Sequence, residues 1–88
     1  MCTYVTENVA LSGSAKGVDG WFRVSRATVY FDHPVHAPLD HSLNIDFADV
    51  TAPTRRVAVE LGADSARALA HAILATLEAA ADLQKDAS

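Results

Sequence analysis

The chain has few of the residues that mark disulfide-rich, nucleic-acid-binding or membrane-spanning proteins. One cysteine among 88 residues excludes a disulfide framework. Seven Lys and Arg residues stand against eleven Asp and Glu residues, and the net charge of −4 excludes a generic binder of the nucleic-acid phosphate backbone. The longest apolar stretch is the Ala- and Leu-rich C-terminal segment. It contains Arg67, His71 and Glu78, so we expect neither a transmembrane span nor a membrane partner.

The N-terminal region also lacks the pattern of a signal peptide. Thr3, Thr6, Glu7 and Asn8 interrupt its start, and no positively charged segment leads into an apolar one. A single cysteine fits a compartment in which thiols stay reduced. Together these features predict a cytoplasmic protein.

The composition is that of an ordinary globular domain. Half of the residues are hydrophobic and 20% are charged, which argues against disorder. The length allows one domain, residues 1–88, with a radius of gyration of roughly 12 Å. Such a domain buries only about 60–65% of the surface that its unfolded chain exposes, so its stability is modest without a partner or ligand. Because the apolar content is high for one small core, we expect a homodimer.

The hydrophobic pattern predicts four strands followed by one helix. The strands cover about 3–12, 21–32, 42–48 and 55–61, and the helix covers about 64–84. The glycine-rich segment 13–20 reads as a flexible connection between the first two strands. This order predicts an α+β fold, in which a four-stranded antiparallel sheet carries one long C-terminal helix packed on one face.

Two details of the pattern define the faces of these elements. The apolar parity changes within the second strand, which indicates a β-bulge near Ser25–Arg26. The predicted helix has an apolar arc opposite its charged side. That arc consists of Ala66, Leu69, Ala70, Ile73, Leu74, Leu77 and Ala80. On its flank, Ala68, Ala72, Ala75 and Ala79 either reflect the helix propensity of alanine or form a seam of small residues for a second helix.

One proline-containing loop concentrates the residue types that carry chemistry. His33, His36 and His41 fall within nine residues, and Asp32 and Asp40 precede two of them. Two prolines stiffen the loop, which lowers the entropy cost of holding side chains in a site. Imidazole is the commonest metal ligand, and a nearby carboxylate binds the metal or orients the imidazole. Three histidines with water would suit zinc, and two with a carboxylate would suit non-haem iron.

Simpler interpretations of these residues stay open. The spacings match no established metal fingerprint, and chelation by both His33 and His36 requires the prolines to make a turn. The histidines would otherwise bind loop backbone groups or lie in solvent, or one would serve as a metal-free acid or base. Cys2 is either a supporting thiolate or a small buried hydrophobe. Whether Met1 is removed to expose Cys2 is not decided by the sequence.

A second candidate site lies on the sheet face that one helix would leave open. Tyr30, Asn44 and Asp46 fall on that face, together with charged residues of the second and fourth strands such as Arg56 and Glu60. These side chains would bind a small molecule or a partner protein. The alternative is a solvated face with cross-strand ion pairs.

Several segments along the chain resemble a known family. They are the run Met1–Tyr4, Gly20–Phe22, Ala27–Pro34, Leu43–Phe47 and Val57–Leu61. In these segments, and along nearly its whole length, the chain resembles a family of small uncharacterised actinobacterial proteins of unknown function. The resemblance implies a free-standing single-domain protein and assigns no role to any residue.

Two functions therefore stand as alternatives. The first is a small metal-binding protein or metal-dependent enzyme, with zinc or iron held by His33, His36 and His41 and supported by Asp32, Asp40 or Cys2. The second is a metal-free homodimeric module that binds a small molecule or partner protein through the open sheet face. The density of ligand types in the histidine loop favours the first, and whether the protein is an enzyme stays open.

Overall fold

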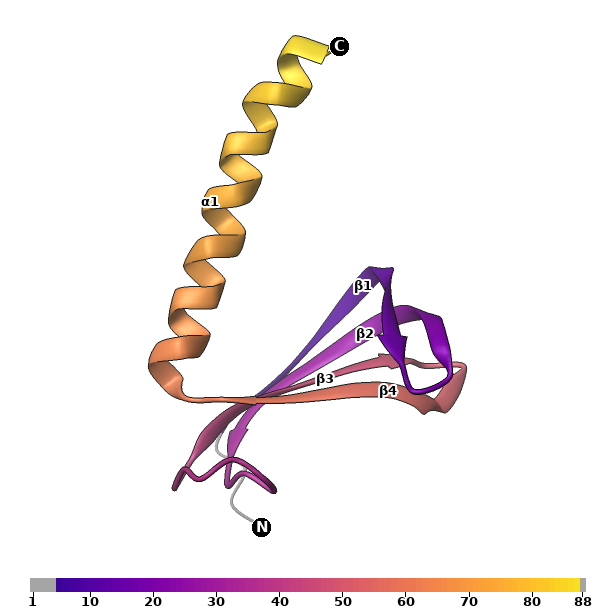
Figure 1. The fold of residues 1–88 in the computed structure, drawn as a ribbon, viewed down its shortest axis with the longest axis vertical. Helices are drawn as coiled ribbons and strands as arrows, with labels where there is room; N and C mark the ends of the chain where they lie inside the picture. The colour runs from indigo at the N-terminus through magenta and orange to yellow at the C-terminus, as the bar shows by residue number, and fades with distance from the viewer. Residues whose placement is uncertain (1–4, 88) are drawn as a thin grey trace.

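The computed structural model describes residues 5–87, with side chains described through residue 83, and it confirms the α+β fold. Four strands precede one helix (Figure 1). The elements are β1 Val5–Gly17, β2 Gly20–Asp32, β3 Ser42–Asp49, β4 Ala52–Leu61 and α1 Ala63–Ala87. Each strand pairs antiparallel with the next, so the sheet order is β1-β2-β3-β4.

The pairing register separates an apolar face of the sheet from a polar one. On β3, Leu43 pairs with Phe31 of β2 and with Leu61 of β4, so these three side chains share the apolar face. The neighbouring position Asn44 pairs with Tyr30 and Glu60, and this row lies on the polar face because successive side chains alternate. The predicted alternation of the third strand is therefore confirmed.

The first hairpin is longer than the sequence predicts. The segment 13–20, predicted as a flexible connection, is mostly strand, and the pairing continues to Gly17 opposite Gly20. The chain reverses through Val18 and Asp19, and Gly20 adopts a φ of 112°, a region that favours glycine. The prediction was wrong because small and polar residues hide the strand pattern, while pairing with β2 orders the segment.

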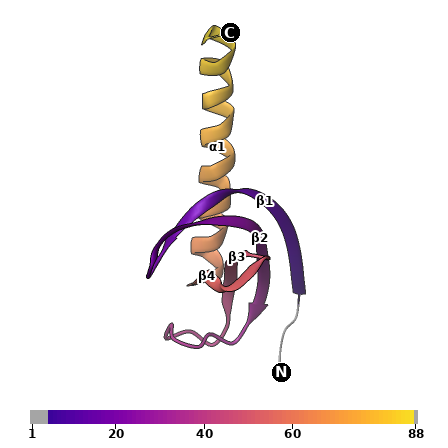
Figure 2. The same ribbon diagram turned by 90° about the vertical axis from the view of Figure 1, so that its right-hand side faces the viewer.

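A bulge lies where the apolar parity of β2 changes, as predicted, but the extra residue belongs to β1, whose Leu11 and Ser12 stand opposite Ser25. The register of β1 and β2 shifts between Ala10 and Gly13, which pair with Arg26 and Val24 on either side of Ser25. Figure 2 shows both strands curving strongly over the rest of the sheet. Among the described residues, the buried apolar side chains are Phe22, Val24 and Ala27, and all three lie on β2 around this shift.

The helix meets the sheet only along its first turns and then rises away from it (Figures 1 and 2). Residues from Ala63 to Ile73 line an apolar cavity of about 570 Å³ together with Val29, Ile45 and other residues of the apolar face. The contact is short because α1 leaves the end of β4 at a steep angle to the strands, while the sheet curves away from it.

No helix in the described part of the chain has the length and apolarity needed to cross a membrane.

Candidate functional site

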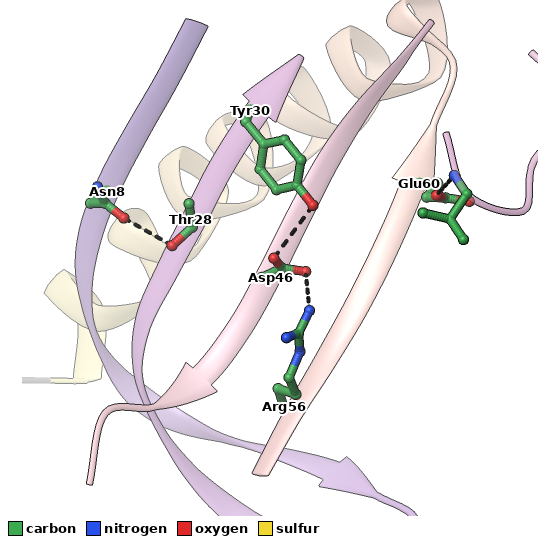
Figure 3. Close-up of polar contacts among 7 residues, drawn as sticks. Asn8, Thr28, Tyr30, Asp46, Arg56 and Glu60 are labelled. Carbon is green, nitrogen blue, oxygen red and sulfur yellow. Dashed lines mark hydrogen bonds and ion pairs between the residues drawn. The ribbon is translucent and has the colours of Figure 1, made fainter. Parts of the chain in front are cut away.

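The polar face of the sheet carries a network centred on Asp46. The phenol of Tyr30 donates to Asp46 Oδ2 at 3.5 Å, and the Arg56 guanidinium lies 3.4 Å from Asp46 Oδ1 (Figure 3). Strand pairing explains this meeting, because Asp46 lies on the central strand β3 between β2 and β4. Next to the network, Thr28 donates to Asn8 at 2.8 Å across β1 and β2.

The network keeps Tyr30 protonated and presents charge to solvent. Burial, followed by the negative charge of Asp46, raises the pKa of Tyr30 above its ordinary value. The phenol therefore remains a hydrogen-bond donor at neutral pH. The Arg56 side chain is 56% exposed, whereas that of Asp46 is 24% exposed. Arg56 therefore extends toward solvent from the carboxylate that holds it.

Asn44 lies buried beside this network. Only 4% of its surface is exposed, and its Oδ1 accepts a hydrogen bond of 2.6 Å from the hydroxyl of the fully buried Ser42. Because the amide oxygen is engaged, the NH₂ group is the part of Asn44 that offers further hydrogen bonds. A buried amide held in this way is a rigid donor rather than a solvated surface group.

Glu60 binds the histidine loop to β4. Its Oε1 accepts backbone N–H groups from His36 and Ala37, each at 3.0 Å, and its Oε2 accepts the N–H of Val35. These backbone donors, led by Val35, lower the pKa of Glu60 below its ordinary value because they stabilise the charged carboxylate. The loop is therefore fixed against the polar face by one side chain.

The loop and the strands line an open cavity of about 620 Å³ on the polar face. Its lining joins the Asp46 network to the loop segment held by Glu60. The lining residues are Tyr30, Val35, His36, Ala37, Asn44, Asp46, Arg56, Ala58, Val59 and Glu60. This volume lies within the range of roughly 300–1,000 Å³ that is usual for small-molecule sites. All three residues predicted for the open face, Tyr30, Asn44 and Asp46, line this one cavity.

The structure separates the three loop histidines into two places. The rings of His33 and His41 stack with centroids 4.6 Å apart, and His41 also stacks on Phe31 at 5.7 Å. His36 instead lies in the lining of the polar cavity, next to Glu60. The loop therefore pairs its outer histidines and holds the middle one elsewhere.

The predicted supporting groups have local roles in this loop. Asp32 accepts the backbone N–H of His33 at 2.7 Å, and the backbone carbonyl of Asp40 lies 2.9 Å from His33 Nδ1. Cys2 lies outside the described residues. Within the range that the structure describes, no group of three or more His, Cys, Asp or Glu side chains is arranged to hold a metal ion.

Sequence reasoning placed Arg56 and Glu60 on the polar face but missed what they do. The parity of β4 indicates their face and nothing about their partners. Glu60 binds loop residues that are 23 to 25 positions away in the chain, and the pattern of single residues carries no signal for such a contact. Glu60 pairs with Asn44 in the register of β3 and β4, and this pairing is the signal that would have indicated the position of Glu60.

Comparison with known proteins gives a family and no relative of known function. No curated protein and no solved structure matches the chain. One family model, described as a family of unknown function (DUF6295), matches residues 1–86. The predicted membership of an uncharacterised family is thereby confirmed, and the chain belongs to the DUF6295 family of unknown function.

Proposed function

We propose that this protein is a metal-free module that binds a small polar molecule in the cavity of its polar face, and that it works as a homodimer. The observation that supports the proposal is the convergence of four groups on one cavity: the Tyr30 phenol, the Asp46 carboxylate, the exposed Arg56 guanidinium and the buried Asn44 amide. Few but well-oriented polar groups over an apolar floor are typical of small-molecule sites.

The chemistry of the lining indicates the class of ligand. Arg56 and Asn44 offer donors, while Asp46 offers an acceptor, so the cavity suits a molecule that carries both an anionic or accepting group and a donating group. Ala58 provides apolar contact on β4. Amino acids and short hydroxy acids have this combination of groups. A cytoplasmic location, predicted from the single cysteine, is part of the same proposal.

The first test is a thermal-shift screen of the purified protein against amino acids, hydroxy acids, polyols and simple monocarboxylates. A compound that raises the melting temperature is then titrated by calorimetry into wild type and into Arg56→Gln. Loss of a charged hydrogen bond costs about 1.5–3 kcal/mol, so we expect binding to weaken by roughly tenfold or more.

Arg55→Gln is the matched control for this test. Arg55 is the neighbouring residue on β4 and faces the opposite side of the strand, so its loss leaves the cavity intact. Equal weakening by both substitutions, or a panel without any stabilising compound, would count against the proposal.

A second candidate function is metal binding at the stacked histidines, and one observation favours it. If His33 Nδ1 carries the proton, it donates to the Asp40 carbonyl and leaves Nε2 as the ligating nitrogen, which is the usual arrangement of a metal-binding histidine. His41 lies next to it, and Asp32, Cys2 or a rearranged His36 would complete a zinc or iron site.

Elemental analysis of the native protein tests this second candidate. Stoichiometric zinc or iron that is lost in His33→Ala and retained in His71→Ala would establish it, because His71 lies on the helix outside the loop. Protein without bound metal, whose melting temperature is unchanged by Zn²⁺, Fe²⁺, Cu²⁺ or Ni²⁺, would remove it.

A further inference from the structure

The apolar surface of the described chain lies largely in solvent. Leu74, Leu77 and Leu83 on the outer part of α1 are 63%, 62% and 71% exposed, and Ile73, which lines the cavity beside the sheet, is still 51% exposed. These leucines belong to, or adjoin, the apolar arc of the helix. Several large apolar side chains exposed on one helix mark an interaction site.

The size of this exposed surface matches what a stable dimer buries. The accessible surface is 6769 Å², whereas a compact monomer of this mass exposes about 5,000 Å². The excess is about 1,800 Å² for each copy, and an interface that buried all of it would total about 3,600 Å², within the range of obligate homodimers. The radius of gyration agrees, since 15.2 Å exceeds the value of about 12 Å for a compact chain of this length.

The shape of the molecule indicates how a second copy fits. The inner part of α1 and the apolar face of β2, β3 and β4 form the two walls of an open apolar cavity. The outer part of the same helix has no sheet of its own chain beneath it. Each copy therefore has one uncovered cavity and one apolar helix segment without a surface to cover.

A two-fold axis between two copies covers both the open cavity and the exposed helix segment of each copy. In a two-fold dimer the same surface is used by both copies, so a helix that enters the partner's cavity brings the partner's helix into its own. We propose that two copies of this chain form a homodimer in which the outer half of each α1 packs into the apolar cavity between the helix and the sheet of the other copy. This inference deepens the dimeric part of the proposed function and is independent of ligand binding on the polar face.

The contact has a defined apolar centre. On the sheet side the cavity is lined by Val29, Phe31, Leu43, Ile45 and Leu61, which come from three adjacent strands. On the helix side of the same cavity, Leu69, Ala70 and Ile73 face these strands. Leu74 and Leu77 of the incoming helix provide the matching side chains, since both are exposed and apolar and lie on the same side of the helix.

The test begins with the molecular mass of the full chain by light scattering and sedimentation over a range of micromolar concentrations. We expect a dimer for wild type and a dissociation constant raised by on the order of a hundredfold in Leu77→Asp. One buried leucine contributes about 1.5–3 kcal/mol, and a two-fold interface contains it twice. A monomeric wild type at these concentrations would overturn the inference.

Ala79→Asp is the matched control, and it also tests the alternative seam of small residues. Ala79 is exposed on the opposite side of the same helix, and the introduced residue is the same. We expect Ala79→Asp to remain dimeric. Dissociation by Ala79→Asp with no effect of Leu77→Asp would show that the dimer uses the alanine seam, and would overturn the inference.

A second measurement needs no substitution and therefore does not depend on the stability of the variants. In a sample mixed from ¹³C-labelled and unlabelled copies, an isotope-filtered experiment records nuclear Overhauser effects only between one copy and another. We expect such effects between the methyl groups of Leu74 or Leu77 in one copy and those of Val29 or Ile45 in the other. Effects that join only helix to helix, without the sheet, would contradict the proposed packing.

Titration of the same mixed sample with a compound bound in the polar cavity distinguishes the two proposals. If the contacts between copies are present and no compound binds, the proposed packing of the helices is supported and the proposed small-molecule site is contradicted. If a monomeric protein binds the compound, the proposed small-molecule site is supported and the proposed packing of the helices is contradicted.

Discussion

Glu60 links two parts of the chain that local sequence does not connect. A single carboxylate accepts the N–H groups of three successive loop residues, Val35 to Ala37, and so holds the loop against β4. Without it these backbone donors would need water or another acceptor. The shape of the polar cavity therefore depends on one side chain that touches both of its walls.

Replacement of Glu60 by Gln tests this role directly. Gln is neutral and keeps one accepting oxygen in place of two, so we expect hydrogen-exchange protection of the Val35, His36 and Ala37 amides to fall roughly fivefold or more. Protection of the β2–β3 amides should stay unchanged. Glu78→Gln, at an exposed position of α1, serves as the control and should alter neither set. Unchanged protection of the loop in Glu60→Gln would contradict the role.

The same contact gives a pH dependence with a definite sign. The pKa of Glu60 is lowered in the folded protein, so the carboxylate favours the folded loop above the unfolded-state pKa, and this contribution is lost as the pH falls through the folded value. The window lies below the ordinary value of 4.5. We expect the amide proton shifts of Val35, His36 and Ala37 to titrate together with a midpoint below 4.5. A midpoint above that value would contradict the assignment.

At the scale of elements, the sequence predicts strands and helix well where their pattern is local. Leu43, Ile45 and Phe47 alternate with polar neighbours, so β3 and its two faces follow from three residues of one parity. The end of β1 was not predicted, because Gly13 to Gly17 contain small and polar residues whose strand geometry comes from pairing with β2. The outward path of α1 was not predicted either, since an apolar arc indicates which side is covered and not what covers it.

The turn of the first hairpin gives a prediction at this scale. Gly20 adopts a φ of 112°, so an added Cβ is strained there even though no atom lies within 4 Å of it. We expect Gly20→Ala to lower the free energy of unfolding by about 1–2 kcal/mol in urea denaturation. Gly13→Ala, where an added Cβ also meets no atom within 4 Å and φ is not positive, should be neutral or slightly stabilising. Equal effects of the two substitutions would refute the strain.

For the molecule as a whole, each face of the sheet has its own cavity. The polar face holds the cavity lined by Tyr30, Asn44 and Asp46, whose common face followed from strand parity. The apolar face holds the open cavity beside α1. The three loop histidines do not form the single cluster that their spacing suggests, because the path of the loop stacks His33 on His41 and places His36 on the polar side. Such a path depends on contacts with distant strands, which spacing alone does not reveal.

The central claim is that the polar cavity binds a small polar molecule, and a titration followed by two-dimensional ¹H–¹⁵N NMR tests it most directly. The probe is the compound from the thermal-shift panel that stabilises wild type most. We predict that the largest shift changes fall on the Asn44 side-chain amide, the Arg56 Nε–H and the backbone of Val35 to Ala37. In Arg56→Gln, the changes at Asn44 and Val35 to Ala37 should need roughly tenfold more compound or higher. Changes centred instead on His33 and His41, or spread over the apolar side of α1, would contradict the claim.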